Sequence, residues 1–412
     1  MNEKCGLLGR RLAHSYSPAI HAQLGRYPYA LYETEPESLA DFLRCGDFHG
    51  LNVTIPYKKS AVPFCSTLSP TAQKLQSVNT LIRQQDGTLR GDNTDYDGFL
   101  WLVRRSGINA SGKKALVLGS GGASAAVQLA LCQLGARVTV ISRRGTDNYQ
   151  NLSRHADAQL LINATPVGMY PENGESPVDL TYFPHLEAVF DLIYNPCRTA
   201  LLMQAERLGI PAFGGLAMLA AQARRSSELF QNKSLPDTLV DQVMLSIRRK
   251  MDNLILIGMP GSGKSTVAAE LGKLLGRSVE DSDTLIEEAA HCSVPEIFFR
   301  EGESGFRRRE TEVLRDVGRR SGIILATGGG CIMRPENYAL LHQNGTICYL
   351  RRSLDELATA GRPLSKAGGV RELYQQRAPF YESFSDFSVE NISSPQKIAE
   401  AIKEAFYEIC SH

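Results

Sequence analysis

The chain has 412 residues, of which 43% are hydrophobic and 22% charged, with 45 basic and 44 acidic side chains. This length exceeds one ordinary hydrophobic core and predicts two functional units. The balanced charge argues against attraction to nucleic acid or to an anionic membrane surface, so the expected partners are small molecules. The sequence leaves the oligomeric state open.

The predicted compartment follows from what the sequence lacks. No apolar run approaches the about 20 residues that span a bilayer, and the polar start MNEKCG has no apolar signal segment. The nine cysteines are scattered without a CxxC pair, which fits reduced thiols better than disulfides or a zinc site. We therefore expect a cytoplasmic protein.

The chain begins with a predicted strand from Cys5 to Leu8, followed by HSYSPAIH. Ser17 and Pro18 are typical of a helix start, with Ser17 as N-cap and proline at the first helical position. Ser15 has no such structural duty. Paired hydroxyls beside a helix N-terminus would suit a carboxylate ligand.

A second strand is predicted in GLNVTIPYKKSA, ending at Pro56, with Lys58 just beyond it. More polar residues follow at predicted strand-to-loop positions: Asn79, Asp92, Asn93 and Asp95. Polar side chains gathered at strand ends are candidates for a site, although each alone is more often a turn former. Lys58 alone could equally be a solvated surface lysine.

Residues 113–142 are predicted to form a strand, a glycine turn, a helix and a second strand. The turn is a variant of the dinucleotide-binding fingerprint: Gly119, Ser120, Gly121, Gly122 and Ala123. An acidic residue usually ends the second strand of an NAD enzyme, whereas this strand ends at Ser142, Arg143 and Arg144. Arginines favour the additional phosphate of NADP. Asp147 follows shortly, so a rearranged phosphate contact stays open.

After Gln222, a charged amphipathic stretch to about Ser246 predicts one helix, and residues 248–250 (RRK) are interpreted as a solvated linker. A buried strand is then predicted from Leu254 to Ile257, ahead of the phosphate-loop pattern GxxxxGKS and a helical run. The loop's expected cofactor contacts are Gly261, Ser262, Gly263, Lys264, Ser265 and Thr266.

Within this loop, Lys264 can reach the outer phosphates and the Ser265 hydroxyl can hold Mg²⁺. The alternative is a glycine-rich turn with a solvated lysine. Asp281 and Asp283 follow at a predicted strand end, where one can serve the metal and the other a substrate hydroxyl. An acidic helix cap at Asp283 is the structural alternative.

The charge run at residues 307–309 is of the kind that usually forms a solvated helix face, which we expect for Arg308 and Arg309. Arg307 lies three residues before Glu310. One helix face could therefore order its guanidinium for a bidentate contact with a carboxylate.

Seven segments in order resemble shikimate dehydrogenases up to about residue 245: HSYSPAIH, NVTIPYK, SVNT, GDNTD, NATPVGM, DLIYNP and GGLAMLAAQ. The resemblance implies that Lys58 and Asp95 are the catalytic pair. Reducing a ring ketone requires a proton donor at the oxygen while hydride reaches the carbon, and a lysine held by a carboxylate suits that role. The resemblance also implies a substrate-binding set and one further cofactor residue: Ser15, Ser17, Thr54, Asn79, Tyr194 and Gln222, with Gly215 for the cofactor.

From Met251 onward, DSD, GExxFRxxE, GGG, RPL and RAPxY resemble shikimate kinases. This resemblance implies that Asp283 polarises the ring hydroxyls, that Arg307 and Arg377 clamp the substrate carboxylate, and that Gly329 presents its backbone to the acceptor. It further implies that Arg362 belongs to a lid over ATP and acts with Lys264 in catalysis. The stretch before RPL is shorter than the usual lid region, which leaves the adenine contact open.

These observations predict an α/β protein: a two-subdomain dehydrogenase with a Rossmann-like NADP domain, fused to a P-loop kinase, each with parallel sheets. The predicted ranges are 1–247 for the dehydrogenase (1–100 plus 223–247 for substrate, 101–222 for NADP) and 251–412 for the kinase. The expected reactions are NADPH-dependent reduction of 3-dehydroshikimate and ATP- and Mg²⁺-dependent phosphorylation of shikimate. Three alternatives stay open: a degenerate half that serves as a scaffold or binding module, a first half that prefers quinate with NAD, and a related kinase such as one for gluconate.

Overall fold

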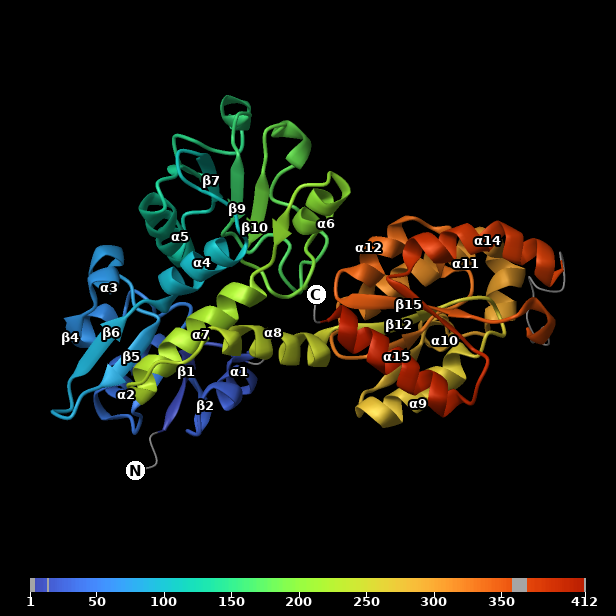
Figure 1. The fold of residues 1–412 in the computed structure, drawn as a ribbon, viewed down its shortest axis with the longest axis horizontal. Helices are drawn as coiled ribbons and strands as arrows, with labels where there is room; N and C mark the ends of the chain where they lie inside the picture. The colour runs from blue at the N-terminus through green and yellow to red at the C-terminus, as the bar shows by residue number, and fades with distance from the viewer. Residues whose placement is uncertain (1–3, 13–14, 358–368, 411–412) are drawn as a thin grey trace. The chain divides into compact units, whose positions relative to one another are not determined.

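The computed structural model describes residues 4–12, 15–357 and 369–410, and the chain forms two compact units (Figure 1). The first unit comprises Met1–Met169, Glu175–Tyr194 and Gln204–Ile247. The second comprises Tyr170–Gly174, Asn195–Met203 and Arg248–His412. Each unit is built from α/β layers, as the sequence predicts.

The first sheet of the first unit has six strands: β1 (Cys5–Gly9), β2 (Tyr29–Glu33), β3 (Gly50–Val53), β4 (Cys65–Leu68), β5 (Thr80–Arg83) and β6 (Leu89–Asp92). Their order in space is β2-β1-β3-β5-β6-β4. β5 runs antiparallel to both β3 and β6, so the expectation of purely parallel sheets is wrong here. The reason is local, because only a short turn containing Gly87 at φ 83° joins β5 to β6, and such a turn reverses the chain.

The second sheet of this unit is wholly parallel, in the order β11-β10-β9-β7-β8. Its strands are β7 (Lys114–Leu118), β8 (Arg137–Ile141), β9 (Leu160–Asn163), β10 (Ala188–Asp191) and β11 (Ala212–Phe213). With α5 (Gly122–Gln133) between β7 and β8, the predicted strand, turn, helix and strand over 113–142 are confirmed.

The remaining helices of the first half are α1 (Ser17–Leu24), α2 (Leu39–Cys45), α3 (Pro70–Leu75), α4 (Thr94–Arg105), α6 (Ala200–Arg207), α7 (Leu216–Gln231) and α8 (Thr238–Met251). α4 places acidic residues in its first turn and arginines in its last, an arrangement that complements the helix dipole. Figure 1 shows α4 and α7 crossing beside each other between the two sheets.

Several predicted boundaries are wrong. α1 begins at Ser17 with Tyr16 as its N-cap, so Ser17 does not cap the helix. The strand expected to reach Pro56 ends at Val53, and Asn79 lies just before β5 rather than at a strand end. The helix expected after Gln222 is two helices, because the chain turns left-handed at Asn232, a conformation that asparagine tolerates.

The expected linker at residues 248–250 is instead the last turn of α8. The Arg248 guanidinium donates to the Cys410 carbonyl at 3.0 Å and that of Arg249 to the Tyr407 carbonyl at 3.3 Å. The Arg248 side chain is only 19% exposed. These arginines therefore belong to the packing of the second unit.

The second unit has a five-stranded parallel sheet in the order β13-β14-β12-β15-β16. The strands are β12 (Asn253–Ile257), β13 (Val279–Asp281), β14 (Ile324–Ala326), β15 (Gly345–Arg351) and β16 (Phe387–Glu390). The helices are α9 (Lys264–Leu275), α10 (Ser282–Ala290), α11 (Val294–Val317), α12 (Glu336–His342), α14 (Val370–Phe384) and α15 (Pro395–Ile409). β12 is central and fully buried, which confirms the strand predicted ahead of the phosphate loop.

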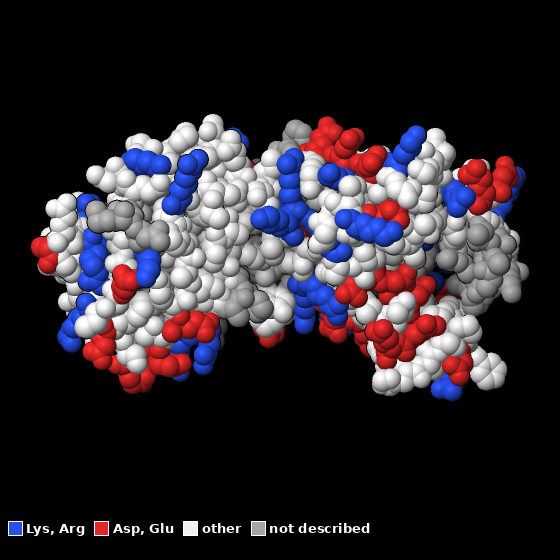
Figure 2. Space-filling view, turned by 90° about the horizontal axis from the view of Figure 1, so that it is seen from below, with Lys and Arg blue, Asp and Glu red and all other residues white. Residues whose placement is uncertain are grey.

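The surface agrees with the charge balance of the sequence. Figure 2 shows both basic and acidic side chains on the face in view, in small groups of either sign, and neither sign covers the face alone. Within the parts of the chain that the structure describes, none of the helices has the length and apolarity that a membrane crossing requires.

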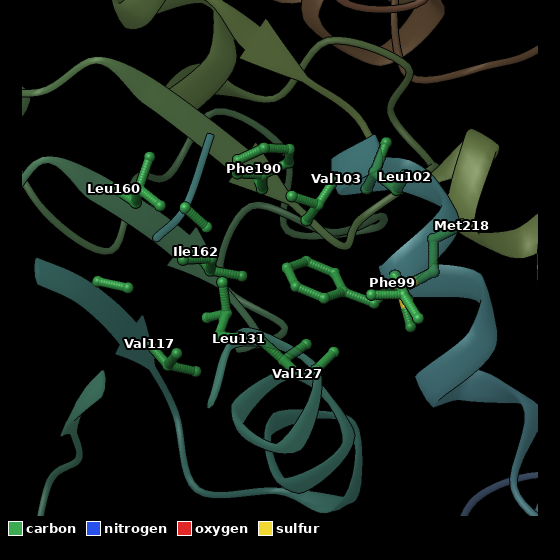
Figure 3. Close-up of a cluster of buried hydrophobic side chains, with 14 of the residues drawn as sticks. Phe99, Leu102, Val103, Val117, Val127, Leu131, Leu160, Ile162, Phe190 and Met218 are labelled. Carbon is green, nitrogen blue, oxygen red and sulfur yellow. The ribbon is translucent and has the colours of Figure 1, made fainter. Parts of the chain in front are cut away.

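The largest apolar cluster of the first unit lies between α4, α5 and the second sheet (Figure 3). Phe99 from α4 and Phe190 from β10 meet edge to face, with ring centroids 6.0 Å apart. Both rings are fully buried. Because α4 also carries the predicted catalytic Asp95, this cluster fixes the helix that presents the carboxylate.

We predict that Phe99→Ala lowers the unfolding free energy of the first unit by about 3–5 kcal/mol, since it removes a buried ring and leaves a cavity. Urea unfolding followed through Trp101, the chain's one tryptophan, reports on this helix. Phe299→Ala is the matched control, because Phe299 is 91% exposed. Equal effects of the two substitutions would contradict the prediction.

Candidate active sites

The predicted catalytic pair of the first unit is in contact. Lys58 Nζ donates to Asp95 Oδ2 at 2.6 Å, and the two side chains are 20% and 11% exposed. The second carboxylate oxygen accepts from Asn79 Nδ2 at 2.8 Å. Both oxygens of Asp95 are thereby fixed, and the lysine is held at the edge of solvent where a substrate can reach it.

A buried polar network extends from this pair to α7. The Thr94 backbone N–H donates to Asn79 Oδ1 at 2.7 Å, and the Thr94 hydroxyl donates to Gln222 Oε1 at 3.3 Å. Asn79 Nδ2 also lies 3.4 Å from the same Gln222 oxygen. Three predicted site residues, Asn79, Asp95 and Gln222, thus share one network, and Thr94 is a member that the sequence did not reveal.

Gly98 makes the approach of α4 to α7 possible. A Cβ at this position would lie 2.8 Å from the Met218 carbonyl oxygen and 2.9 Å from the Gln222 Cβ. Any larger residue would push Gln222 away from Asn79. A glycine inside a helix pattern, three residues after a candidate carboxylate, was the available signal for this close contact.

The predicted hydroxyl set lies on other elements of the same unit. The Ser17 N–H donates to Ser15 Oγ at 3.2 Å. Ser15 therefore has a structural role at the start of α1, contrary to the expectation from the sequence. Thr54 follows β3, and the Tyr194 ring lies 5.5 Å from that of Tyr16. Among the described residues, no hydrogen bond joins these side chains to Lys58 or Asp95, so their membership of one substrate site stays a prediction.

The glycine turn after β7 leaves open space at the N-terminus of α5. Gly119 adopts φ 102°, and Gly121 is the N-cap of α5. A Cβ at Gly121 or Gly122 would meet nothing within 4 Å. The space above this helix N-terminus is thus open, and Ser120 and Ala123 lie in the same turn. Such a terminus favours an anionic group such as a pyrophosphate.

The predicted cofactor residues beyond this turn differ in their surroundings. Arg143 and Arg144 are exposed after β8, and Ser142 is half-buried. Gly215 is the N-cap of α7, where a side chain would overlap the Leu192 carbonyl. Packing therefore explains this glycine whether or not a cofactor lies against it.

In the second unit, the phosphate loop runs from β12 into α9, and its glycines Gly258, Gly261 and Gly263 have φ of 150°, 83° and 92°. Lys264 is buried and donates to the carbonyls of Gly258 and Met259 at 2.9 and 3.0 Å. The alternative of a solvated lysine is therefore wrong. Ser262 is fully buried within the loop, and Ser265 and Thr266 are exposed.

The predicted metal ligands lie together. The Ser265 hydroxyl donates to Asp281 Oδ2 at 2.8 Å, while Asp281 Oδ1 accepts from the Asp283 N–H at 3.0 Å. Asp281 is thus the cap of α10, and the suggested cap at Asp283 is wrong. Two oxygen donors beside a phosphate loop fit Mg²⁺, which typically keeps several waters and takes one or two protein ligands.

The triple glycine after β14 is the meeting point of the predicted substrate residues. A Cβ at Gly328 would lie 2.6 Å from Asp283 Oδ1, and a Cβ at Gly330 would overlap the Arg307 guanidinium. The Gly329 carbonyl accepts from Arg377 Nη1 at 2.9 Å. A Cβ at Gly329 would also lie 2.7 Å from Pro260, so the predicted substrate residues lie beside the phosphate loop.

Two further side chains support this cluster. Arg307 Nη1 donates to Glu310 Oε2 at 2.8 Å, and both side chains are buried. Burial raises the pKa of Glu310 to about 6, with the Arg307 charge opposing the rise. The Tyr381 hydroxyl donates to the Gly329 carbonyl, a contact that the sequence did not indicate. Arg309, expected on a solvated face, instead makes an ion pair with Glu301 at 2.7 Å.

Two predicted positions need separate mention. Arg362 lies outside the described residues, so its role in a lid stays a prediction. Arg308 is 63% exposed, as expected of a solvated helix face.

Comparisons with known proteins match both halves. The model of the shikimate dehydrogenase substrate binding domain matches residues 7–81, and the shikimate kinase model matches residues 260–407. The chain is 34% identical over 266 residues to the shikimate dehydrogenase (NADP(+)) of Dehalococcoides mccartyi, covering 57% of this chain and 92% of that protein. It is 38% identical over 256 residues to that of Oleidesulfovibrio alaskensis, covering 56% and 90%.

Solved structures give the same result. A chorismate mutase/shikimate 5-dehydrogenase fusion protein from Clostridium acetobutylicum matches with a TM-score of 0.58 and 34% identity, covering 61% of this chain and 98% of that one. The Thermus thermophilus shikimate 5-dehydrogenase in complex with NADP(H) and shikimate matches at 0.54 and 34%, covering 58% and 98%. A quinate dehydrogenase from Corynebacterium glutamicum in complex with NAD matches at 0.55 and 26%, covering 60% and 99%. The chain therefore belongs to the shikimate dehydrogenase family and carries a shikimate kinase domain in its second half.

Proposed function

We propose that this chain catalyses two consecutive reactions. Residues 1–247 reduce 3-dehydroshikimate to shikimate with NADPH, and the remainder phosphorylates shikimate to shikimate 3-phosphate with ATP. The observation that carries the proposal is that predicted site residues of each chemistry lie within hydrogen-bond reach of one another: Lys58 with Asp95 in the first unit, and Arg377 with the triple glycine in the second.

In the reduction, NADPH supplies the hydride when it is bound. Lys58 donates the proton to the carbonyl oxygen, and Asp95 orients the lysine and stabilises its charge. Asn79 and Gln222 would donate to or accept from the ring hydroxyls, and the hydroxyls of Ser15 and Ser17 would hold the carboxylate. The buried network behind Asp95 keeps this geometry in place before the substrate arrives.

In the phosphorylation, Mg²⁺ held by Ser265 and Asp281 would neutralise phosphate charge. Arg307 and Arg377 would grip the shikimate carboxylate, and Asp283 would orient the acceptor hydroxyl beside the phosphate loop. Phosphoryl transfer depends chiefly on alignment and charge neutralisation. The convergence of these groups on three glycines supports both requirements.

The alternatives are less well supported. A degenerate half would not need an intact Lys58–Asp95 contact or a buried Lys264 held over its own loop. The curated relatives named above carry NADP(+) in their names, and the exposed Arg143 and Arg144 suit that cofactor, so quinate with NAD is not favoured. Two guanidinium groups beside Asp283 fit a carboxylated polyol such as shikimate.

A two-step assay tests the proposal. The purified chain should reduce NADP⁺ with shikimate as sole substrate, and it should release ADP from ATP and Mg²⁺ only when shikimate is present. Failure of either half reaction in a folded preparation would remove that half of the proposal.

The first prediction from this proposal concerns Lys58. Lys58→Ala should lower dehydrogenase turnover by about a hundredfold or more with little change in shikimate affinity, since it removes a proton-transfer group. The kinase rate of this variant should not change. Lys59→Ala is the matched control, because Lys59 is the adjacent lysine and is exposed. A loss confined to affinity would contradict the catalytic role.

The second prediction concerns Glu310 and pH. Below a pH of about 6 this carboxyl group is protonated and no longer fixes Arg307 by charge, so the kinase KM for shikimate should rise as the pH falls from 7 to 5. Glu310→Gln should give a high KM with a flatter pH profile. The dehydrogenase KM for shikimate in Glu310→Gln serves as the internal control and should not change. A wild-type kinase KM that is constant over this range would refute the prediction.

The contribution of Glu310 to the unfolding free energy should change with pH in the opposite direction to substrate binding, and is larger at low pH. Burial raises the pKa of Glu310 from 4.5 to about 6, so the folded state favours the protonated form. The contribution, about 2 kcal/mol, is fully present below pH 4.5 and is lost as the pH rises through 6.

The third prediction concerns the boundary between the halves. Fragments 1–247 and 248–412 should keep their respective activities within a few-fold, because each contains its own sheet, nucleotide turn and substrate residues. A fragment 252–412 should melt several degrees lower than 248–412, since it lacks the contacts of Arg248 and Arg249 with α15. Separate activity assays of the fragments and thermal melts of 248–412 and 252–412 test these expectations. An inactive 248–412 fragment would show that the kinase depends on the first half.

A further inference from the structure

The loop that follows β8 is closed on itself. The Ser142 N–H donates to the Asp147 carbonyl at 3.2 Å, and the Gly145 N–H donates to the Ser142 carbonyl at 3.3 Å. Asn148 Nδ2 donates to the Gly145 carbonyl at 3.2 Å. A Cβ at Gly145 would lie 2.6 Å from Ser142 Oγ and 3.1 Å from the Asp147 carbonyl oxygen, so the turn is closely packed there. Arg143 and Arg144 are therefore exposed residues of a turn whose backbone is held by hydrogen bonds.

Asp147 brings a carboxylate into this basic loop. Its Oδ1 lies 2.9 Å from His155 Nε2, and the His155 side chain is only 10% exposed. His155 Nδ1 is buried, and among the described residues it has no hydrogen-bond partner. This asymmetry fits the tautomer with its proton on Nε2, which donates to the carboxylate. The imidazole thus holds the one acidic group of the loop.

The position of this carboxylate bears on cofactor choice. A free carboxylate near Arg143 and Arg144 would pair with a guanidinium and compete with a phosphate for it. It would also repel the 2′-phosphate of NADP while accepting hydrogen bonds from the ribose hydroxyls of NAD. With one oxygen held by a buried histidine, the Asp147 carboxylate is less free to make either contact.

We propose that His155 is a specificity-determining positioning residue, which favours NADP over NAD by holding the Asp147 carboxylate away from the 2′-phosphate site. The inference rests on the proposed function, in which this loop binds the cofactor. His155 itself does not touch the cofactor. Its effect passes entirely through Asp147, and this dependence is what can be measured.

The test is a double-mutant cycle on the full-length chain, with dissociation constants for NADP⁺ and NAD⁺ measured by calorimetry. His155→Leu should weaken NADP⁺ binding by about tenfold and leave NAD⁺ binding unchanged or stronger. Asp147→Asn alone should change NADP⁺ binding by less than about twofold, because the carboxylate is already held away. Combining Asp147→Asn with His155→Leu should restore wild-type NADP⁺ binding.

Two further variants separate the effect of the Asp147 position from a general loss of structure. His155→Gln keeps an N–H donor and should behave like the wild type. Asp147→Glu leaves His155 buried and moves the carboxylate, so it should reproduce the selective loss of NADP⁺ binding even if His155→Leu fails to fold. The fluorescence of Trp101, which lies on α4 of the first unit, reports on folding in each case.

Equal weakening of NADP⁺ and NAD⁺ in His155→Leu would assign a merely structural role to His155 and overturn the inference. A double variant as weak as His155→Leu, or unchanged selectivity in Asp147→Glu, would also overturn it. A wild-type chain that binds NAD⁺ more tightly than NADP⁺ would overturn the proposed cofactor together with the inference. A wild-type preference for NADP⁺ that survives His155→Leu would overturn the inference alone.

Discussion

The close approach of α4 and α7 at Gly98 is the constraint on which the first unit depends. Because no side chain stands at Gly98, the Met218 carbonyl and Gln222 pack directly on α4. Asp95 lies one helical turn earlier on α4, with its two oxygens committed to Lys58 and Asn79. The apolar cluster around Phe99 then anchors α4 to the parallel sheet. The absence of a side chain at Gly98 thus lets one helix pack into the core of the nucleotide subdomain and also carry part of the polar network of the substrate subdomain.

In the second unit, close packing of site residues depends in a similar way on three consecutive glycines. Asp283, Arg307 and Arg377 come from three different helices and reach the same short segment, where a larger residue would displace the side chains of Asp283 or Arg307. Burying these charges together is costly unless each is paired. Glu310 supplies the pairing for Arg307, and the raised pKa of its carboxyl group is the consequence of that burial. The carboxylate that holds the arginine is therefore protonated at a higher pH than an ordinary glutamate.

The sequence predicted those parts of the fold whose signal is local. The strand, turn and helix patterns at residues 113–142 and 254–275 are confirmed, because a buried parallel strand followed by a glycine turn leaves a distinctive pattern. The antiparallel β5 was missed because its direction depends on a short turn rather than on composition. The last turn of α8 was missed because RRK resembles a solvated linker until its carbonyl partners near residue 410 are known.

The candidate sites divide in the same way. Lys58 with Asp95, Ser265 with Asp281 and Arg307 with Glu310 were named from the sequence and are in contact in the structure. The sequence could not predict the roles of Thr94, Tyr381 and the Asp147–His155 contact. These roles depend on tertiary contacts, which produce no repeating pattern in the sequence.

The two proposed sites would bind one molecule by different means. The first offers its carboxylate the hydroxyls of Ser15 and Ser17, and the second offers the guanidinium groups of Arg307 and Arg377. Hydrogen bonds between a charged and a neutral group are weaker than those in which both partners are charged. A reversible reductase that must release its product benefits from the former. A kinase that draws the same product onward by phosphoryl transfer from ATP can hold it with the latter. If both reactions occur as proposed, each site has its own residues for the shikimate carboxylate, so the two-step reaction does not require a shared binding site.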